Sequence, residues 1–579
     1  MIKVDHLSYA FPQKDLYDNI SFTLEAGQHC AFIGSNGSGK TTLIDMLISP
    51  DNYVFDGNIE MEPNCHIGYV SQFSQAEPTE DINVFEYIGE KFIRLQQRIT
   101  ELCTQMETAS DIEPLLEEYQ ETLDAFNAIG GDDYESEIHK KLALANLSKH
   151  KDLMISELSG GEFKLIQVIK EMLNKPDLMI MDEPDVFLDF ENVISLKNLL
   201  NAFKNTLLII THNRYLLNNC FNKIIHLENM QLQEFDGSYI DYNFSLLQTK
   251  VELQELSIAD DEEIKRNDAL IDRLRFIATH YDSVANGKSL NARMKIQERL
   301  EARRIKHPFV DIKQPSIGLA TDSPLEDTLA LKVTDYSAKF DDLLLEHVNF
   351  EIRSNDKVAI IGSNGTGKTT LLKDILDNKL DSIEINDDIH IAYLSQVQGE
   401  ILNESNTIED EFFDAGFKSY EEIYQHISAY GFDQEMAKQK ISSLSGGERN
   451  VLQLAKVSAG SSNMLLLDEP TSHLDMHSQV ALEQAIQNYN GAILMISHDY
   501  YSIINCMDYV LMIDNKTIRK MTMKKFKKMV YANHFDKDYL DFEEKKKAVE
   551  LKIEAALKAS DFELAKILVE ELEGIIQSL

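Results

Sequence analysis

The sequence predicts an α/β protein made of two similar halves, each built around a parallel sheet. The first observation is a repeat: residues 34–42 read GSNGSGKTT, and residues 362–370 read GSNGTGKTT. The second is the context, because an apolar run with strand character (residues 30–33 and 358–361) precedes each copy and a helix-like segment follows it. Strand, glycine-rich loop and helix in this order form the unit from which open α/β sheets are built.

The repeated loop is a candidate phosphate-binding site, since each copy contains G-x-x-x-x-G-K-[ST]. Its glycines let backbone N–H groups point at phosphate oxygens near the positive end of the next helix. Lys40 and Lys368 would reach the β- and γ-phosphates, and the hydroxyls of Thr41 and Thr369 would contact Mg²⁺. An ordinary turn is the alternative, which two copies in one context disfavour. The loop residues assigned to binding are Gly34, Ser35, Asn36, Gly37, Ser38, Gly39, Lys40, Thr41, Thr42, Gly362, Ser363, Asn364, Gly365, Thr366, Gly367, Lys368, Thr369 and Thr370.

Size and charge narrow the classes of protein. The 579 residues exceed one hydrophobic core, and the net charge of −41 repels nucleic acid at long range, so any RNA contact needs a local basic patch. No stretch approaches the roughly 18 apolar residues of a membrane span, and the N-terminus lacks a signal pattern, so we expect a cytoplasmic protein. The five cysteines show no C-x-x-C spacing, which disfavours disulfide and zinc sites.

Two further motifs occur once in each half. A glutamine, Gln72 or Gln396, closes an apolar strand and is a candidate to ligate Mg²⁺ or hold an attacking water. The pentapeptide LSGGE then opens a helix at residues 158–162 and 444–448. Serine and two glycines at a helix start form a second anion-binding nest. The nest residues are Ser159, Gly160, Gly161, Ser445, Gly446 and Gly447.

Acidic pairs and histidines follow apolar strands in both halves. Carboxylates at the carboxyl ends of strands lie where ligands bind in open α/β sheets. In each pair the aspartate suits Mg²⁺ and the glutamate is placed to deprotonate a water, while the later histidine could sense the γ-phosphate. The metal candidates are Thr41, Gln72, Asp182, Thr369, Gln396 and Asp468, and the catalytic candidates are Glu183, Glu469, His212 and His498.

An aromatic residue, Phe11 or Phe340, precedes each glycine-rich loop by about two dozen residues. It could stack on adenine, or it could be a core aromatic of an antiparallel strand; the sequence leaves both open.

These motifs resemble those of ATP-binding cassette proteins, in which they are named Walker A, Q-loop, signature, Walker B, D-loop and switch histidine. Two cassettes without a membrane domain resemble the ABC-F family. The resemblance implies two P-loop ABC-type nucleotide-binding domains joined by an α-helical hairpin linker, with a short C-terminal helical extension. In the family the cassettes close head to tail on two ATPs, so the loop at Gly34 would face the signature at Leu444, and the loop at Gly362 the signature at Leu158.

The resemblance also implies a function. It predicts an ATPase that converts ATP and water to ADP and phosphate with Mg²⁺, as a monomer with intramolecular cassette pairing. In its ATP-closed form it would bind the ribosome near the exit-tRNA site and act on the peptidyl-transferase region through its linker. Ribosomal protection against antibiotics is the first candidate role, a housekeeping translation factor is the alternative, and an ATPase subunit of a transporter is a third class.

Spacing between the copies locates extra chain in the first half. The lysines lie 328 residues apart and the glutamines 324, but the signatures, acids and histidines 286. The 38 extra residues therefore fall between Gln72 and the first signature. Residues 85–147 have apolar positions at helical spacing, which matches the arm of ABC-F proteins. A surface hairpin with no partner is the alternative.

The sequence predicts four regions: a first cassette (1–240, with the arm at about 85–147), a helical hairpin linker (241–308), a second cassette (309–518) and a C-terminal part (519–579). From Lys288 to Lys306 the linker has seven basic and two acidic residues, so it is a candidate rRNA and tRNA contact, or else a solvated helix face. We expect the second cassette to close near Asp514, followed by a basic stretch from Lys520 to Lys528 and two helices, 541–560 and 561–579. The arm and this basic stretch are further candidate contacts. The helices could pack on the cassette or contact the ribosome.

The two halves are unequal. The second reads DEPTSHLD and SHD, close to the family pattern, and keeps Arg449 after its signature. The first reads DEPDVFLD and THN, with Asp185, Val186, Phe187 and Asn213 at the variable positions. We therefore hypothesise that the site built on Lys40 hydrolyses ATP more slowly.

Overall fold

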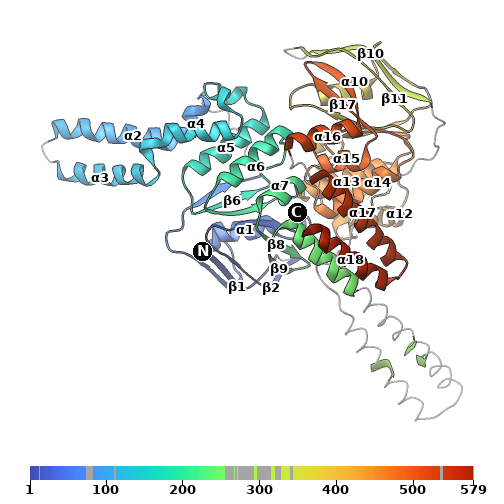
Figure 1. The fold of residues 1–579 in the computed structure, drawn as a ribbon, viewed down its shortest axis with the longest axis horizontal. Coiled ribbons are helices and arrows are strands. Elements are labelled where there is room, and N and C mark those ends of the chain that lie inside the picture. The colour runs from blue at the N-terminus through green and yellow to red at the C-terminus, as the bar shows by residue number, and fades with distance from the viewer. Residues whose placement is uncertain are drawn as a thin grey trace. The chain divides into compact units, whose positions relative to one another are not determined.

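The structure is a computed structural model that describes residues 1–11, 14–72, 82–109, 112–253, 266–267, 270–271, 293–295, 315–319, 328–339, 343–534 and 539–577. The chain divides into two compact units. The first comprises Met1–Asp236 and Lys313–Met529, and the second Gly237–Ile312 and Val530–Leu579. The first unit contains two α/β lobes with the same topology (Figure 1), which confirms the predicted fold class.

The first lobe is built on a six-stranded sheet of order β5-β6-β7-β3-β8-β9. Its strands are β3 (His29–Ile33), β5 (Ile67–Val70), β6 (Leu178–Asp182), β7 (Thr206–Ile210), β8 (Lys223–Glu228) and β9 (Gln231–Asp236). All pair in parallel except β9, which is antiparallel to β8. Strands β6 and β7 are buried along their whole length, as their continuous apolar sequences predict for central parallel strands.

A three-stranded antiparallel sheet, β2-β1-β4, covers the helix that follows the first glycine-rich loop. It consists of β1 (Ile2–Phe11), β2 (Lys14–Leu24) and β4 (Asp56–Met61), and the helix is α1 (Lys40–Ile48). Leu43 of α1 shares one hydrophobic core with Val4 of β1 and Ile180 of β6. The start of α1, where the loop lies, is thereby fixed between the two sheets.

The second lobe repeats this plan with the orders β11-β10-β13 and β14-β15-β16-β12-β17-β18. Its strands are β10 (Leu329–Lys339), β11 (Leu343–Arg353), β12 (Lys357–Ile361), β13 (Ile383–Ile385), β14 (Ile391–Leu394), β15 (Met464–Asp468), β16 (Ala492–Ile496), β17 (Tyr509–Asp514) and β18 (Thr517–Thr522). The helices of the two lobes that carry or flank the motifs are α5 (Gly160–Leu173), α6 (Phe190–Ala202), α7 (Arg214–Cys220), α10 (Lys368–Asp377), α11 (Ile408–Asp414), α12 (Tyr420–Ala429), α13 (Gly446–Ala459), α14 (Met476–Asn488) and α15 (Tyr500–Cys506).

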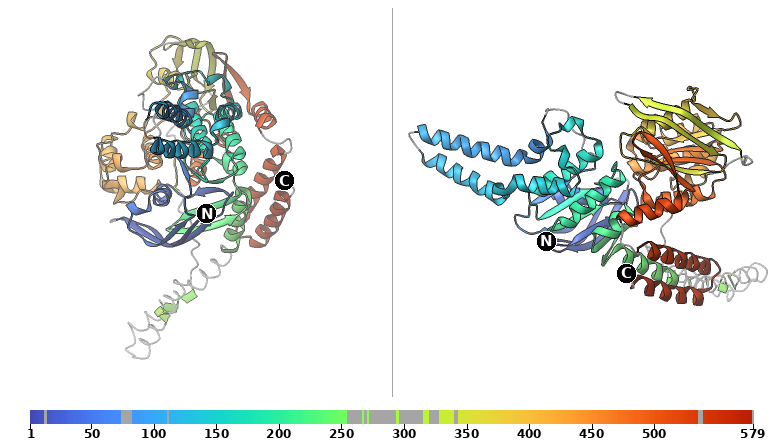
Figure 2. Two further views of the ribbon diagram at one scale, coloured as in Figure 1. Left: turned by 90° about the vertical axis from the view of Figure 1, so that its left-hand side faces the viewer. Right: turned by 45° about the horizontal axis from the view of Figure 1, so that its top comes forward.

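The extra chain of the first lobe is helical, as its periodicity predicts. Helices α2 (Val84–Thr108) and α3 (Glu113–Ala128) run side by side away from the sheets, and α4 (Tyr134–Leu144) returns to them (Figures 1 and 2). A capping box between Asn83 and Glu86 starts α2. Arg98 ties the pair together through an ion pair of 2.6 Å with Glu118.

The prediction that the second cassette closes near Asp514 was wrong. Strand β18 continues the sheet beyond it and pairs antiparallel with β17, so that Asp514 lies opposite Thr517. The first-lobe counterpart of β18 is β9, which lies 286 residues earlier. The offset between the two repeats therefore predicts a strand at the position of β18. Lys520 at the start of the basic stretch lies on this edge strand, with its ammonium 3.5 Å from the ring centroid of Tyr509. Helix α16 (Met523–His534) holds the rest of the stretch.

The second unit contains the start of the linker and the C-terminal helices α17 (Tyr539–Lys558) and α18 (Phe562–Ile576), which confirm the predicted hairpin. Residues 239–253 are helical, and Val251 shares a hydrophobic core with Ile553 of α17 and Leu572 of α18. The hairpin therefore packs on the linker helix, an arrangement that neither sequence alternative named. Of the basic linker run only residues 293–295, which are helical, lie within the described residues. No helix in the described parts is long and apolar enough to cross a membrane.

Candidate active sites

The two glycine-rich loops have the same internal geometry. The ammonium of Lys40 donates hydrogen bonds to the carbonyls of Gly34 (2.8 Å) and Ser35 (2.9 Å), and Lys368 makes the equivalent bonds at the same distances. Burial lowers the pKa of both lysines. The residue before each lysine is a glycine in the left-handed region, and a Cβ at Gly39 would meet the ring of Tyr17. Each loop thus places a lysine at the start of a helix, where its ammonium can bind a phosphate.

The structure brings together residues predicted to hold Mg²⁺. The hydroxyl of Thr41 donates a 2.8 Å hydrogen bond to Asp182. Burial raises the pKa of Asp182 and of Asp468 to about 6, and among the described residues neither carboxylate oxygen of Asp468 has a hydrogen-bond partner. The described chain contains no group of three or more His, Cys, Asp or Glu that could hold a metal. The hydroxyl and carboxylate oxygens of Thr41 and Asp182 fit Mg²⁺, which takes one or two carboxylates and completes its shell with hydroxyl, phosphate and water oxygens.

At the site built on Lys40, the candidate base is held by polar side chains from both lobes. Glu183 accepts a 2.6 Å hydrogen bond from the amide of Gln72, and its carboxylate lies 3.3 Å from Nδ1 of His473 in the second lobe. Burial opposes ionisation of Glu183, but the hydrogen bond to His473, together with the charge of the nearby histidines and a smaller contribution from Lys40, outweighs it and lowers the pKa.

At the site built on Lys368, the base has a less polar setting. Glu469 accepts a 3.2 Å hydrogen bond from the backbone N–H of His498, whose Nε2 lies 3.4 Å from the carboxylate. Burial raises the pKa of Glu469 to about 7. Phe187 stands at the position equivalent to His473, and its ring cannot donate a hydrogen bond to a carboxylate.

The switch histidines lie at the ends of β7 and β16. Within the described residues neither ring nitrogen of His212 has a hydrogen-bond partner, although both are buried. Burial lowers the pKa of His212 to about 4, so the ring is neutral. His498 lies 3.2 Å from the side-chain oxygen of Asn364, and burial lowers its pKa as well. An unpartnered buried imidazole is suited to accept a ligand such as a phosphate.

The remaining candidates are less enclosed. Gln396 is exposed and lines the cavity described below. Phe11 is 45% exposed and contacts Tyr9 edge to face at 5.3 Å, so it is not the buried core aromatic of the alternative interpretation. Phe340 lies outside the described residues.

Each glycine-rich loop contacts the D-loop of the other lobe, which is the segment after the acidic pair (residues 185–189 in the first lobe and 471–475 in the second). Asn36 donates from its backbone to Asp475 (2.9 Å) and from its side chain to the carbonyl of His473 (2.8 Å). Asn364 repeats both bonds, to Asp189 and to the carbonyl of Phe187, at 3.1 Å each. The second oxygen of each aspartate caps its own helix, α14 or α6. One carboxylate thus sets a helix start and holds the opposing loop.

The signatures also face the opposing loops. A Cβ added at Gly447 would collide with the side-chain amide of Asn36. On the other side, Ser159, Gly160 and Gly161 line a cavity of about 490 Å³ together with Lys368, Glu469 and His498. The arrangement is the head-to-tail one, with the loop at Gly34 against the second signature and the loop at Gly362 against the first.

The signature serines have a second role, which was not predicted from the sequence. Ser159 and Glu162 form a capping box at the start of α5, and Ser445 and Glu448 form one at the start of α13. The signal was present, because serine followed three residues later by glutamate is the capping-box pattern.

Each D-loop lies at the site of the opposite cassette, so the divergent residues of the first cassette do not all belong to the Lys40 site, as the hypothesis of a slower Lys40 site assumed. Phe187 belongs to the site built on Lys368, since its carbonyl binds Asn364 and it lines the same cavity as Lys368. Asp185 stays within the first lobe and accepts a 2.7 Å hydrogen bond from Thr211. The sequence differences are therefore divided between the two sites.

Comparisons with known proteins agree with this geometry. The ABC transporter family profile matches residues 17–186 and 345–472. The chain belongs to the ABC-F family of tandem ATP-binding cassette proteins. It is 30% identical to the uncharacterized ABC transporter ATP-binding protein YfmM of Bacillus subtilis (strain 168), over 86% of this chain and 96% of that protein. It is 28% identical to ABC transporter F family member 2 of Arabidopsis thaliana, over 88% of this chain and 76% of that protein.

Among solved structures, a model of ribosome-bound archaeal Pelota and ABCE1 has a similar fold. The TM-score is 0.53, the sequence identity is 15%, and the match covers 91% of this chain and 80% of that one.

Proposed function

We propose that this ABC-F protein binds two ATP molecules between its cassettes, hydrolyses them to ADP and phosphate, and binds the ribosome near the exit-tRNA site while the cassettes are closed. One observation carries the proposal: each Walker A loop lies against the D-loop of the opposite cassette, through Asn36 and Asn364. A nucleotide in either loop would touch both cassettes, so ATP would stabilise the closed form by mass action.

The chain's own residues supply the hydrolytic machinery. Lys40 and Lys368, with the loop N–H groups, would neutralise the β- and γ-phosphates. Glu183 or Glu469 would take a proton from the attacking water as its oxygen bonds to the γ-phosphorus and ADP leaves. His212 and His498 would hydrogen-bond the γ-phosphate.

Threonine and aspartate at each site would hold Mg²⁺, with a glutamine as a further ligand: Thr41, Asp182 and Gln72 at one site, and Thr369, Asp468 and Gln396 at the other. The ion supplies positive charge that stabilises the oxygens of the transferring phosphoryl group.

Two observations support ribosome binding: membership of the ABC-F family and the positions of the basic residues. Members of the ABC-F family act at the exit-tRNA site, and the archaeal ABCE1 of similar fold is ribosome-bound in its structure. In a chain of net charge −41, RNA phosphates would be met by local basic runs, namely the linker from Lys288 to Lys306 and the stretch from Lys520 to Lys528. The linker would act on the peptidyl-transferase region, and the arm would make a further contact. Antibiotic protection is the role we place first.

Sedimentation with ribosomes tests the proposal. The variant Glu183→Gln/Glu469→Gln should pellet with purified ribosomes only when ATP is present. Lys40→Ala/Lys368→Ala, which cannot close on ATP, is the matched control and should stay in the supernatant. Failure of the first variant to bind would overturn the proposal, and pelleting with membranes instead would favour a transporter subunit.

Drug susceptibility separates the two ribosomal roles. A sensitive strain that expresses the wild-type chain should tolerate higher concentrations of drugs that act at the peptidyl-transferase centre, whereas one that expresses Lys40→Ala/Lys368→Ala should not. Unchanged susceptibility together with ATP-dependent ribosome binding would favour the housekeeping translation factor.

A further inference from the structure

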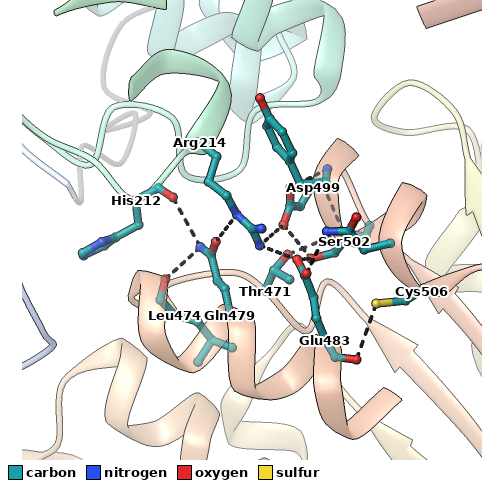
Figure 3. A network of polar contacts seen from close by, with 12 residues as sticks. His212, Arg214, Thr471, Leu474, Gln479, Glu483, Asp499, Ser502 and Cys506 are labelled. Carbon is teal, nitrogen blue, oxygen red and sulfur yellow. Dashed lines mark hydrogen bonds and ion pairs between the residues drawn. The ribbon is translucent and has the colours of Figure 1, made fainter. Parts of the chain in front are cut away.

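A buried charge cluster joins the two cassettes, and three of its residues, Arg214, Gln479 and Asp499, line the same cavity as Lys368 (Figure 3). Its centre is Arg214, the first residue of α7, two residues after the switch histidine His212. Its guanidinium bonds Glu483 of α14 and lies 3.5 Å from Asp499, both in the second cassette. The three side chains are 13%, 9% and 19% exposed, so water screens their charges poorly.

The acidic side of the cluster belongs to the switch region of the second cassette. Asp499 directly follows His498, and its two oxygens accept hydrogen bonds from the N–H of Tyr501 (3.0 Å) and the hydroxyl of Ser502 (2.7 Å). Glu483 accepts from the same hydroxyl at 3.0 Å. Movement of the guanidinium would therefore be felt at the residue next to His498.

The basic side is tied to the switch histidine of the first cassette. Gln479 of α14 accepts a 3.3 Å hydrogen bond from Nε of Arg214 and donates one of 3.4 Å to the backbone carbonyl of His212. The same amide donates to the carbonyl of Leu474 in the second D-loop at 3.0 Å. One polar cluster thus contacts the switch segments of both cassettes and one D-loop.

The cluster has no equivalent across the pseudo-twofold relation of the cassettes. At 286 residues from Arg214, Glu483 and Gln479 stand Tyr500, Lys197 and Val193. Tyr500 packs on the ring of Phe190 at 5.9 Å, an aromatic contact in place of an ion pair. The link through charged groups is therefore made once, between Arg214 of the first cassette and the switch region of the second.

We propose that Arg214 is a positioning residue through which the switch loop of the Lys40 site sets the switch loop of the Lys368 site. Contact with Asp499 holds His498 in place for hydrolysis at the Lys368 site, although Arg214 belongs to the opposite cassette. This inference rests on the proposed function, because it requires that both sites hydrolyse ATP.

Single-turnover hydrolysis at saturating ATP, in chains with one active site, tests the inference. In the Glu183→Gln chain only the Lys368 site is active, and Arg214→Met should lower its rate at least about tenfold, within the range of ordinary coupling between sites. In the Glu469→Gln chain only the Lys40 site is active, and the same substitution should change its rate less than about twofold. Arg214→Lys, which keeps the charge, should restore most of the lost rate.

Two controls separate coupling from simple loss of cassette contact. Tyr500→Met alters the equivalent aromatic contact and should not slow the Lys368 site selectively. In the Glu183→Gln chain, His212→Ala should slow the Lys368 site, but should add no further slowing once Arg214→Met is present, because both act along one path.

Equal slowing of both sites by Arg214→Met, a rise in KM with kcat unchanged, or additive effects of His212→Ala and Arg214→Met would overturn the inference. Absence of hydrolysis in the wild-type chain and in both single glutamate variants would instead overturn the proposed function. The two failures are therefore distinguishable.

Discussion

The sites built on Lys40 and Lys368 share their motifs but differ around the catalytic glutamate. The carboxylate of Glu183 lies against two polar side chains, Gln72 and His473, whereas that of Glu469 accepts a hydrogen bond, within the described residues, only from the backbone of His498 in its own cassette. The pKa of Glu183 is lowered, and that of Glu469 is raised to about 7. The difference comes from the opposing cassette, which supplies His473 to one site and Phe187 to the other.

This comparison shows that a cassette's own sequence does not fix the character of its site. The first cassette carries the divergent D-loop, yet its Phe187 lies in the second cassette's site, while the D-loop of the second cassette, which keeps the family pattern, completes the Lys40 site. Residues near the motifs must therefore be assigned to a site by which loop they contact.

Removal of both bases should have the largest effect. Glu183→Gln/Glu469→Gln should lower ATP hydrolysis at least about a hundredfold, because a positioned general base contributes roughly 10² to 10⁴ in rate. Phosphate release measures the loss, and nucleotide binding should persist as the control. A loss below about tenfold would show that neither glutamate acts as the base.

The second-largest effect is expected from changes where the signature contacts the opposing glycine-rich loop. Gly447→Ala places a methyl group against Asn36 and should slow the Lys40 site about tenfold or more, measured in the Glu469→Gln chain. Gly161→Ala meets the flexible end of Asn192 at 2.9 Å and should affect the Lys368 site less, in the Glu183→Gln chain. Equal effects would mean that the two interfaces close alike.

Exchange of the D-loop residue should make the sites more alike. His473→Phe removes the hydrogen bond that orients Glu183 and should slow the Lys40 site about tenfold, within the roughly 10²-fold that a misplaced group can cost. In the complementary chain, Phe187→His should speed the Lys368 site. Rates that do not respond to His473→Phe would remove the structural basis of the asymmetry.

Loss of a helix cap should have the smallest effect. Asp475→Ala removes the cap of α14 and should lower the free energy of unfolding by about 1 kcal/mol. It also removes the acceptor for the N–H of Asn36, so stabilisation of the chain by ATP should weaken in thermal melts. Asp189→Ala is the matched variant for α6, and a much larger loss for either would indicate a role beyond capping and loop contact.

Much of the site was predictable from the sequence. The strand, loop and helix around Lys40 and the acid at the end of each buried strand follow from local chain properties: glycine freedom, apolar runs and capping patterns. The arm helices and the C-terminal hairpin were predicted from apolar periodicity for the same reason. The end of the second cassette was misplaced because the short, charged strand β18 has little apolar pattern, although its counterpart β9 was available in the repeat.

The sequence by itself determined the two cassettes, the order of their motifs and the chemistry that each motif offers, because these depend on residues close together in the chain. Only the tertiary structure decided which residues share a site. His473, Phe187 and Arg214 act across an interface between segments up to several hundred residues apart, and nothing in their local sequence states which loop they will meet. Their partners are set by how two folded surfaces fit together.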